Sequence, residues 1–102
     1  MIKITLKSQN GEFVSLEAKG HAGSGPYGHD LVCAAISAVI LGGLNALKDD
    51  ESSYSVKVEE GHTLLERNKT LSEHDTIVIE TIVKQIESIA ESHPDNVKLE
   101  RK

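Results

Sequence analysis

The sequence predicts an α+β domain, a two-layer structure in which a mostly antiparallel sheet packs on two helices. Apolar and polar residues alternate near the start, in the middle and near the end of the 102-residue chain, as they do in half-buried strands. Two longer segments repeat apolar residues at helical spacing. Together these segments give the order ββαββαβ, which fits a single domain over residues 1–102.

The first two strands are predicted to form a hairpin. Every second residue is apolar over positions 2–6 and again over positions 14–18. Between these segments lies Asn10-Gly11, a strong turn signal because both residues tolerate a positive φ. The two strands are therefore expected to pair antiparallel.

The segment 31–47 is predicted to be the first helix, and it is apolar on almost every face. One stripe begins at Val32 and Ile36, and a second contains Leu31 and Leu41. A helix that is apolar all round has to be covered on all sides. Because one small sheet covers only one side, we expect a second helix or another subunit on the other, and the sequence favours a homodimer.

The second half of the chain repeats the strand and helix signals. Residues 54–58 alternate, Glu60-Gly61 turns the chain, and a weaker strand follows around 64–65. We then expect a helix that ends before Pro94 and a short last strand around 97–99.

The start of this second helix carries its own signal. Ser72 is followed three residues later by Asp75, which is close to a capping box. Apolar residues then recur at helical spacing over positions 78–90. The second helix is therefore predicted to be amphipathic and to begin at Ser72.

Composition limits the partners of the chain. Sixteen acidic and eleven basic residues give a formal charge of −5, which argues against a broad nucleic-acid surface. Only three aromatic residues occur, so a platform for base stacking is not expected. An acidic surface suits a basic protein partner.

The cysteine content and the hydropathy of the chain indicate the cellular compartment of the protein. Cys33 is the single cysteine, so an intramolecular disulfide is ruled out. The alternating start does not look like a signal peptide, and no stretch approaches the roughly 18 apolar residues of a membrane span. We therefore expect a cytoplasmic protein with no membrane partner.

The candidate catalytic residues surround the start of the first helix. If Asp30 is the N-cap, Cys33 lies in the first helical turn, where the helix dipole favours a thiolate. His21 precedes it by twelve positions and can accept the thiol proton. The alternatives are an inert core cysteine and an exposed histidine. Asp30 either orients the histidine or caps the helix, and capping is favoured.

A glycine-rich segment connects the candidate base to the candidate nucleophile. It contains Gly20, Gly23, Gly25 and Gly28. Such a loop can close over an extended peptide, and backbone N–H groups at the helix start, including that of Cys33, can form an oxyanion hole. The alternative is that the segment is only a connection.

Two other interpretations of this segment are weaker. Gly23-x-Gly25-x-x-Gly28 matches a dinucleotide-binding fingerprint, with Asp49 and Asp50 about twenty positions further on. A nucleotide-binding strand, however, is buried on both faces and continuously apolar, whereas the strand here alternates. We therefore expect no nucleotide cofactor.

A metal site is the other weaker interpretation. His29 and Cys33 are four residues apart, which is metal-ligand spacing, and His21 or His62 would complete such a site. Only one thiol is present, and no Cys-x-x-Cys or His-x-x-x-His pair supports the idea. A cap at Asp30 also leaves His29 outside the first turn, so we expect no metal.

The segment from Gly20 to Ser37 reads Gly-His-Ala, then a glycine-bearing loop, then Gly-His-Asp-Leu-Val-Cys-Ala-Ala-Ile-Ser. It resembles the signature of the ribosomal-processing cysteine protease family (Prp, YsxB-like). This resemblance implies that His21 and Cys33 are the catalytic dyad. Asp30 and Ser37 match the family's aspartate and serine, and His29 receives no role.

The resemblance also implies a cytoplasmic bacterial endopeptidase. Its substrate would be the precursor of large-subunit ribosomal protein twenty-seven, from which a short N-terminal extension is removed. Proteins of this kind are homodimers. The alternative is a non-enzymatic ribosome-assembly or protein-interaction module, which would use the same acidic surface but would need no reactive thiol.

Overall fold

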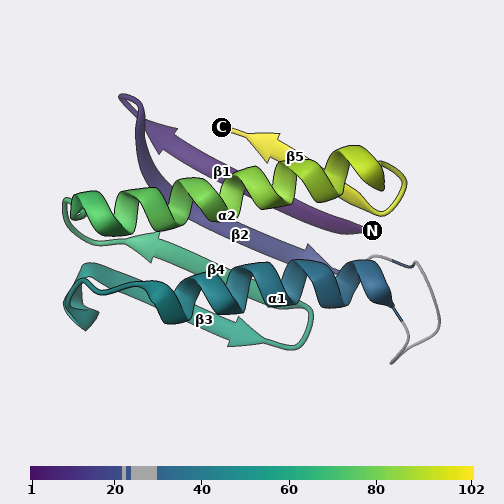
Figure 1. The fold of residues 1–102 in the computed structure, drawn as a ribbon, viewed down its shortest axis with the longest axis horizontal. Helices are drawn as coiled ribbons and strands as arrows, with labels where there is room; N and C mark the ends of the chain where they lie inside the picture. The colour runs from purple at the N-terminus through teal and green to yellow at the C-terminus, as the bar shows by residue number, and fades with distance from the viewer. Residues whose placement is uncertain (22, 24–29) are drawn as a thin grey trace.

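The protein is a two-layer α+β domain in which both helices lie on one face of a five-stranded sheet (Figure 1). The computed structural model describes residues 1–21, 23 and 30–102. In chain order the elements are β1 (Ile2–Gln9), β2 (Glu12–Gly20), α1 (Leu31–Ala46), the short 3-10 helix η1 (Glu51–Ser53), β3 (Tyr54–Glu59), β4 (His62–Arg67), α2 (Glu73–Ser92) and β5 (Val97–Arg101). The predicted fold class and element order are confirmed. The helix η1 was not predicted.

The sheet is mostly antiparallel and has the strand order β3-β4-β2-β1-β5. Only the β1–β5 pair is parallel among the described strands. The turn between β1 and β2 has positive φ at Asn10 (55°) and Gly11 (78°), as predicted. The order places the end of β2 beside the start of β4, where Lys19 pairs with His62.

The core lies between the helices and the sheet. Its sheet side is formed by residues of β1, β2, β4 and β5, and its helix side by single stripes of α1 and α2. The most deeply buried apolar members are Ile2, Ile4, Leu16, Val32, Ile36, Ile40, Leu65, Ile79, Ile82, Ile86 and Val97. Burial of each such side chain contributes about 1.5–3 kcal/mol to stability. In both helices, the apolar residues that recur at helical spacing therefore include those that are buried in the core.

The two helices pack closely because α1 carries a glycine at their contact. A Cβ atom added to Gly43 would lie 2.3 Å from Cδ1 of Ile82 in α2. The opposite stripe of α1 is not covered in this single chain, since Leu31 and Leu41 are exposed. The second helix therefore covers one side of α1 and leaves an apolar stripe on the surface.

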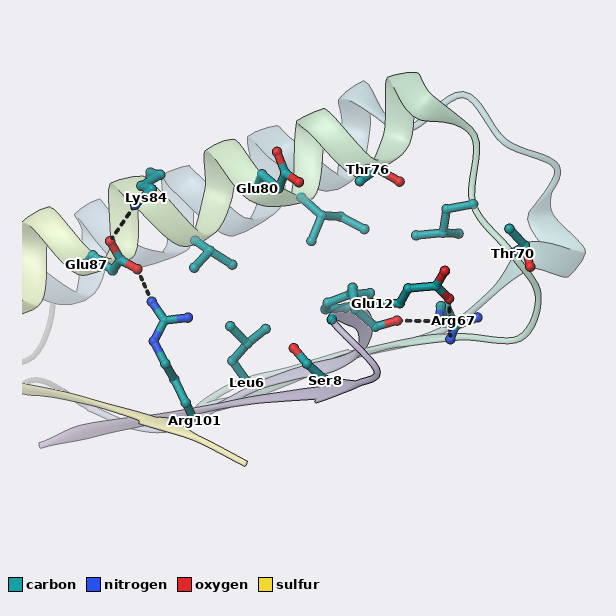
Figure 2. A pocket seen from close by; sticks show the side chains of 15 residues that line it. Leu6, Ser8, Glu12, Arg67, Thr70, Thr76, Glu80, Lys84, Glu87 and Arg101 are labelled. Atoms are coloured by element: carbon teal, nitrogen blue, oxygen red, sulfur yellow. Dashed lines mark hydrogen bonds and ion pairs between the residues drawn. The ribbon is translucent and has the colours of Figure 1, made fainter.

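A cavity of about 470 Å³ lies between α2 and the β1–β2 end of the sheet (Figure 2). Its wall includes apolar Phe13 and Val83, and its rim carries ion pairs, including that of Arg101 with Glu87. The described residues that line it include no cysteine or histidine. The described lining of this cavity therefore offers no thiol or imidazole chemistry.

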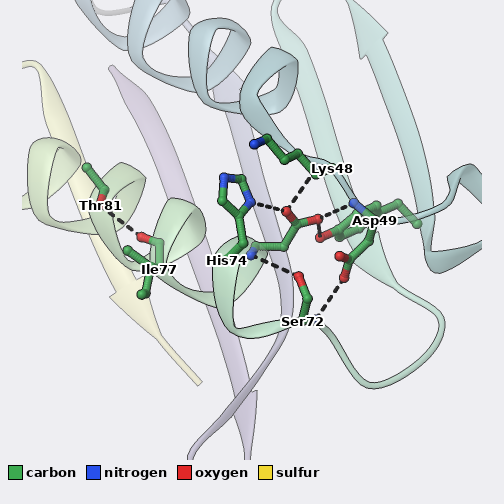
Figure 3. Close-up of polar contacts among 8 residues, drawn as sticks. Lys48, Asp49, Ser72, His74, Ile77 and Thr81 are labelled. Atoms are coloured by element: carbon green, nitrogen blue, oxygen red, sulfur yellow. Dashed lines mark hydrogen bonds and ion pairs between the residues drawn. The ribbon is translucent and has the colours of Figure 1, made fainter.

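The start of α2 is tied to the chain after α1 by one buried carboxylate, that of Asp75 (Figure 3). It accepts hydrogen bonds from the backbone N–H groups of Lys48 (2.8 Å) and Asp49 (2.9 Å), from the Tyr54 hydroxyl (2.8 Å), and lies 2.8 Å from Nδ1 of His74. Burial acts to raise the pKa of Asp75, but these hydrogen bonds outweigh it and hold the pKa well below its usual range.

The cap of α2 differs in detail from the predicted capping box. Ser72 is the N-cap, and its hydroxyl accepts from the Asp75 N–H, as expected. The Ser72 N–H donates to Asp49 rather than to Asp75.

Tyr54, which donates to Asp75, also has a shifted pKa. Burial, and then the hydrogen bond to Asp75, raise the pKa of Tyr54 well above its usual range. The junction therefore keeps Asp75 ionised and Tyr54 neutral.

Candidate active site

Cys33 lies in the first turn of α1, and Asp30 is the N-cap of this helix. One carboxylate oxygen of Asp30 accepts from the Cys33 N–H at 2.9 Å, and the other accepts from the Gly23 N–H at 2.8 Å. The carboxylate thus fixes both the helix start and a residue of the preceding segment. The Cys33 N–H, which the sequence suggested as an oxyanion-hole donor, is engaged by this cap.

His21 follows β2 directly and brings its imidazole to the thiol. Its Nδ1 atom lies 4.0 Å from Sγ of Cys33. The partly buried thiol and the exposed imidazole therefore meet where the end of the sheet approaches the N-terminus of α1. The two groups are therefore neighbours, and proton transfer between them requires the pair to close further to hydrogen-bond distance.

Gly20, expected in the substrate loop, is instead the last residue of β2. Its φ of 95° is in the left-handed region, and a Cβ atom there would lie 2.5 Å from the carbonyl oxygen of Met1. Its N–H donates to the carbonyl oxygen of Gly61 at 2.9 Å. Gly20 therefore positions the backbone that carries His21, and the prediction that it belongs to the loop is wrong.

The other expected loop glycines are placed only in part. Gly23 has a φ of 72° and is held by Asp30. Gly25, Gly28 and His29 lie outside the described residues. The roles predicted for the glycine segment therefore stay predictions.

A groove of about 540 Å³ opens beside the thiol, between α1 and the turn that joins β3 and β4. Its walls are largely apolar, with Ile36 and Ile40 from α1 and Val58 from β3. Glu59 and Glu60 border it at the turn. A groove of this size, apolar inside and acidic at one border, suits a short stretch of extended peptide.

His62, considered above as a possible metal ligand, is paired with a carboxylate. Its Nε2 lies 2.7 Å from Oε2 of Glu17. The hydrogen bond from His62 lowers the pKa of Glu17. No group of three or more His, Cys, Asp or Glu side chains suited to a metal occurs within residues 1–21, 23 and 30–102.

The β3–β4 turn is a part of the site that sequence analysis did not assign. Val58, Glu59 and Gly61 all line the groove. The sequence shows the turn itself, through Glu60-Gly61, but the pairing of β2 with β4 that brings it to His21 is not a local signal. A thiol at a helix N-terminus, facing an imidazole beside a peptide-sized groove, is the arrangement of a cysteine protease.

Comparison with known proteins identifies which cysteine protease family this is. The model of the family described as Cysteine protease Prp matches residues 1–98, and the chain belongs to this family. The Ribosomal processing cysteine protease Prp of Staphylococcus aureus is 29% identical over 104 residues, covering 99% of this chain and 97% of the relative. The protein of the same name from Mycoplasma genitalium is 35% identical over 102 residues, covering 95% and 92%.

Solved structures agree with this assignment. The crystal structure of the S. aureus protease Prp with a covalently linked product peptide superposes with a TM-score of 0.92, at 28% identity and full coverage of both chains. A Streptococcus mutans protein superposes with a TM-score of 0.76, at 30% identity, covering 99% of this chain and 93% of the other. The protein is therefore a cysteine protease, and the non-enzymatic alternative is set aside.

Proposed function

We propose that this protein is a cytoplasmic endopeptidase that removes the N-terminal extension of the precursor of large-subunit ribosomal protein twenty-seven. The observation that carries the proposal is the 4.0 Å approach of Cys33 Sγ to His21 Nδ1 beside the groove. The names of its relatives, ribosomal processing proteases, support the substrate class. The covalently linked product peptide of the S. aureus protease supports thiol chemistry on a peptide.

In the first half-reaction Cys33 is the nucleophile and His21 the base. Nδ1 of His21 takes the thiol proton as Sγ attacks the scissile carbonyl carbon. The resulting tetrahedral intermediate collapses, and the carbon–nitrogen bond breaks. The proton on Nδ1 passes to the departing amine, which is the N-terminus of the mature ribosomal protein.

In the second half-reaction a water molecule releases the extension. The extension is now joined to Sγ of Cys33 as a thioester. Nδ1 of His21 takes a proton from water, the hydroxide oxygen attacks the thioester carbonyl, and the carbon–sulfur bond breaks. The proton returns to Sγ, the extension leaves as a carboxylic acid, and no metal or cofactor takes part in either half.

The charge of the protein suits such a substrate. The chain carries a formal charge of −5, and Glu59 and Glu60 border the groove. A basic precursor is attracted by this field, which raises the rate of encounter and makes it sensitive to salt. The apolar walls of the groove then favour an extended segment with apolar side chains.

The direct test is incubation of the protein with purified ribosomal-protein precursors, followed by intact mass measurement. We expect a single cut that shortens only the precursor of protein twenty-seven at its N-terminus, and Cys33→Ala should leave every precursor intact. Cleavage of other precursors with equal efficiency would refute the substrate assignment. Cleavage by Cys33→Ala would refute the mechanism.

A further inference from the structure

We propose that Gly61, in the turn between β3 and β4, is a positioning residue for His21. Because it lacks a Cβ atom, the turn can lie against the imidazole while the ring faces Cys33. This inference rests on the proposed Cys33–His21 dyad and adds a residue that the chemistry above does not use.

The contacts at both edges of the imidazole carry the proposal. Nδ1 of His21 faces Sγ of Cys33 at 4.0 Å. At the other nitrogen, a Cβ atom built on Gly61 would lie 3.3 Å from Nε2 and 3.7 Å from Cε1. The ring is therefore bordered by the nucleophile on one edge and by the glycine on the other.

The turn cannot simply withdraw from the ring. The carbonyl oxygen of Gly61 accepts a hydrogen bond of 2.9 Å from the N–H of Gly20, the residue directly before His21. The same hydrogen bond that holds the turn thus holds the backbone of the histidine. An added methyl group at position 61 has to be accommodated mainly by the imidazole.

His21 is exposed, so its side chain is free to move toward solvent when it is crowded. With Nδ1 facing the thiol as acceptor, the neutral ring carries its proton on Nε2, the atom nearest Gly61. A displacement of a few tenths of an ångström lengthens a separation that is already 4.0 Å. Since misplacement by about 1 Å can cost roughly 100-fold in rate, a several-fold loss is expected here.

The chain provides a matched control for backbone strain. Gly11 also lies in a hairpin turn with a positive φ, 78° against 72° at Gly61, but a Cβ atom there would meet nothing within 4 Å. Gly11→Ala and Gly61→Ala therefore share the left-handed strain, and only Gly61→Ala crowds His21. Gly61→Asn separates the two effects further, because asparagine tolerates this region, as Asn10 does at a φ of 55°.

The experiment measures alkylation of Cys33 by iodoacetamide as a function of pH, together with the NMR signals of the His21 ring. Neither readout depends on the identity of the substrate. We expect Gly61→Ala and Gly61→Asn to slow alkylation at pH 7 by about fivefold or more and to shift the His21 signals. Gly11→Ala should match the parent in both measurements.

Two results overturn the proposal. One is a Gly61→Ala protein with parental alkylation and unmoved His21 signals. The other is a slow Gly61→Ala protein whose Gly61→Asn counterpart behaves like the parent, because strain and not the Cβ atom would then be the cause. His21→Ala identifies a failure of the dyad itself: parental alkylation in that variant would refute the proposed base, whatever the Gly61 variants do.

Discussion

Cys33 Sγ and His21 Nδ1 lie 4.0 Å apart although twelve positions separate the two residues in the chain. Two anchors produce this proximity. Asp30 caps the helix that carries the thiol, and the hydrogen bond from Gly20 to Gly61 fixes the end of the strand that precedes the imidazole. The geometry therefore depends on residues that do not react themselves.

Asp30 should be more important for structure than for the proton transfer. Asparagine still accepts from the Cys33 N–H but has no second carboxylate oxygen for the Gly23 N–H. We expect Asp30→Asn to keep the helix start and to lose only a few-fold in kcat/KM. Asp30→Ala should lower the free energy of unfolding by about 1 kcal/mol. Urea titration and initial cleavage rates measure both effects, and an Asp30→Asn protein as inactive as His21→Ala would assign Asp30 a direct catalytic role.

Asp75 should make the free energy of unfolding depend on pH in the acidic range. The pKa of Asp75 is lowered in the folded state. The ionised carboxylate therefore stabilises the fold above the usual aspartate pKa of about 3.9, and this stabilisation is lost as the pH falls below that value. We expect Asp75→Asn to lower the free energy of unfolding at pH 7 by about 2–4 kcal/mol, because buried donors lose a charged acceptor. The difference from the parent should shrink below about pH 4.

The control for this prediction is Asp95→Asn, a change at an exposed turn residue. Denaturant titrations of parent and both variants between about pH 7 and pH 2.5 test the prediction. A constant difference between parent and Asp75→Asn over this range would mean that the carboxylate is not the source of the effect.

Two adjacent glycines of α1 should respond oppositely to alanine. At Gly42 a Cβ atom meets nothing within 4 Å, so Gly42→Ala should stabilise the protein by about 0.5–1 kcal/mol through helix propensity. At Gly43 the same atom would lie 2.3 Å from Cδ1 of Ile82. Overpacking costs about 1–3 kcal/mol and should outweigh the propensity gain. Thermal unfolding of the two variants should therefore shift Tm in opposite directions, and equal shifts would contradict the packing described.

The exposed apolar stripe of α1 leads us to expect a homodimer. Leu31 is 79% exposed and Leu41 41%, and on the edge strand β3 both Val56 and Val58 are 53% exposed. Leu41 and Val58 also line the groove, so this surface is continuous with the candidate active site. Light scattering should give about twice the chain mass of 11.1 kDa, and Val56→Lys should weaken the dimer. A strict monomer at micromolar concentration would contradict this expectation.

Much of the fold could be predicted because its signals are local. The turn at Asn10-Gly11 and the caps at Asp30 and Ser72 depend on residues next to the elements they end. The order of strands in the sheet is different, because pairing β2 with β4 joins residues more than forty positions apart, such as Lys19 and His62. Nothing in a local pattern specifies that pairing.

In the candidate site, too, the residues that lie close together in the sequence could be predicted, and a residue brought in by the sheet order could not. Cys33, His21 and Asp30 lie in one continuous segment, so their types and spacing indicate the chemistry. The contribution of Gly61 arises only from the sheet order that brings its turn to the end of β2. The loop assignment of Gly20 was wrong because its positive φ belongs to a strand end held against Met1, which a glycine count cannot distinguish from a loop.

In the proposed mechanism, Cys33 attacks the peptide bond and His21 is its base. The most direct measurement is the mass of the protein itself, taken from an acid-quenched reaction with the precursor and compared among the parent, Cys33→Ser and His21→Ala. We expect the parent to carry the N-terminal extension as a thioester on Cys33. Cys33→Ser should neither carry it nor cleave, and His21→Ala should turn over about 10²–10⁴-fold more slowly. Parental cleavage by Cys33→Ser or by His21→Ala would rule out this mechanism.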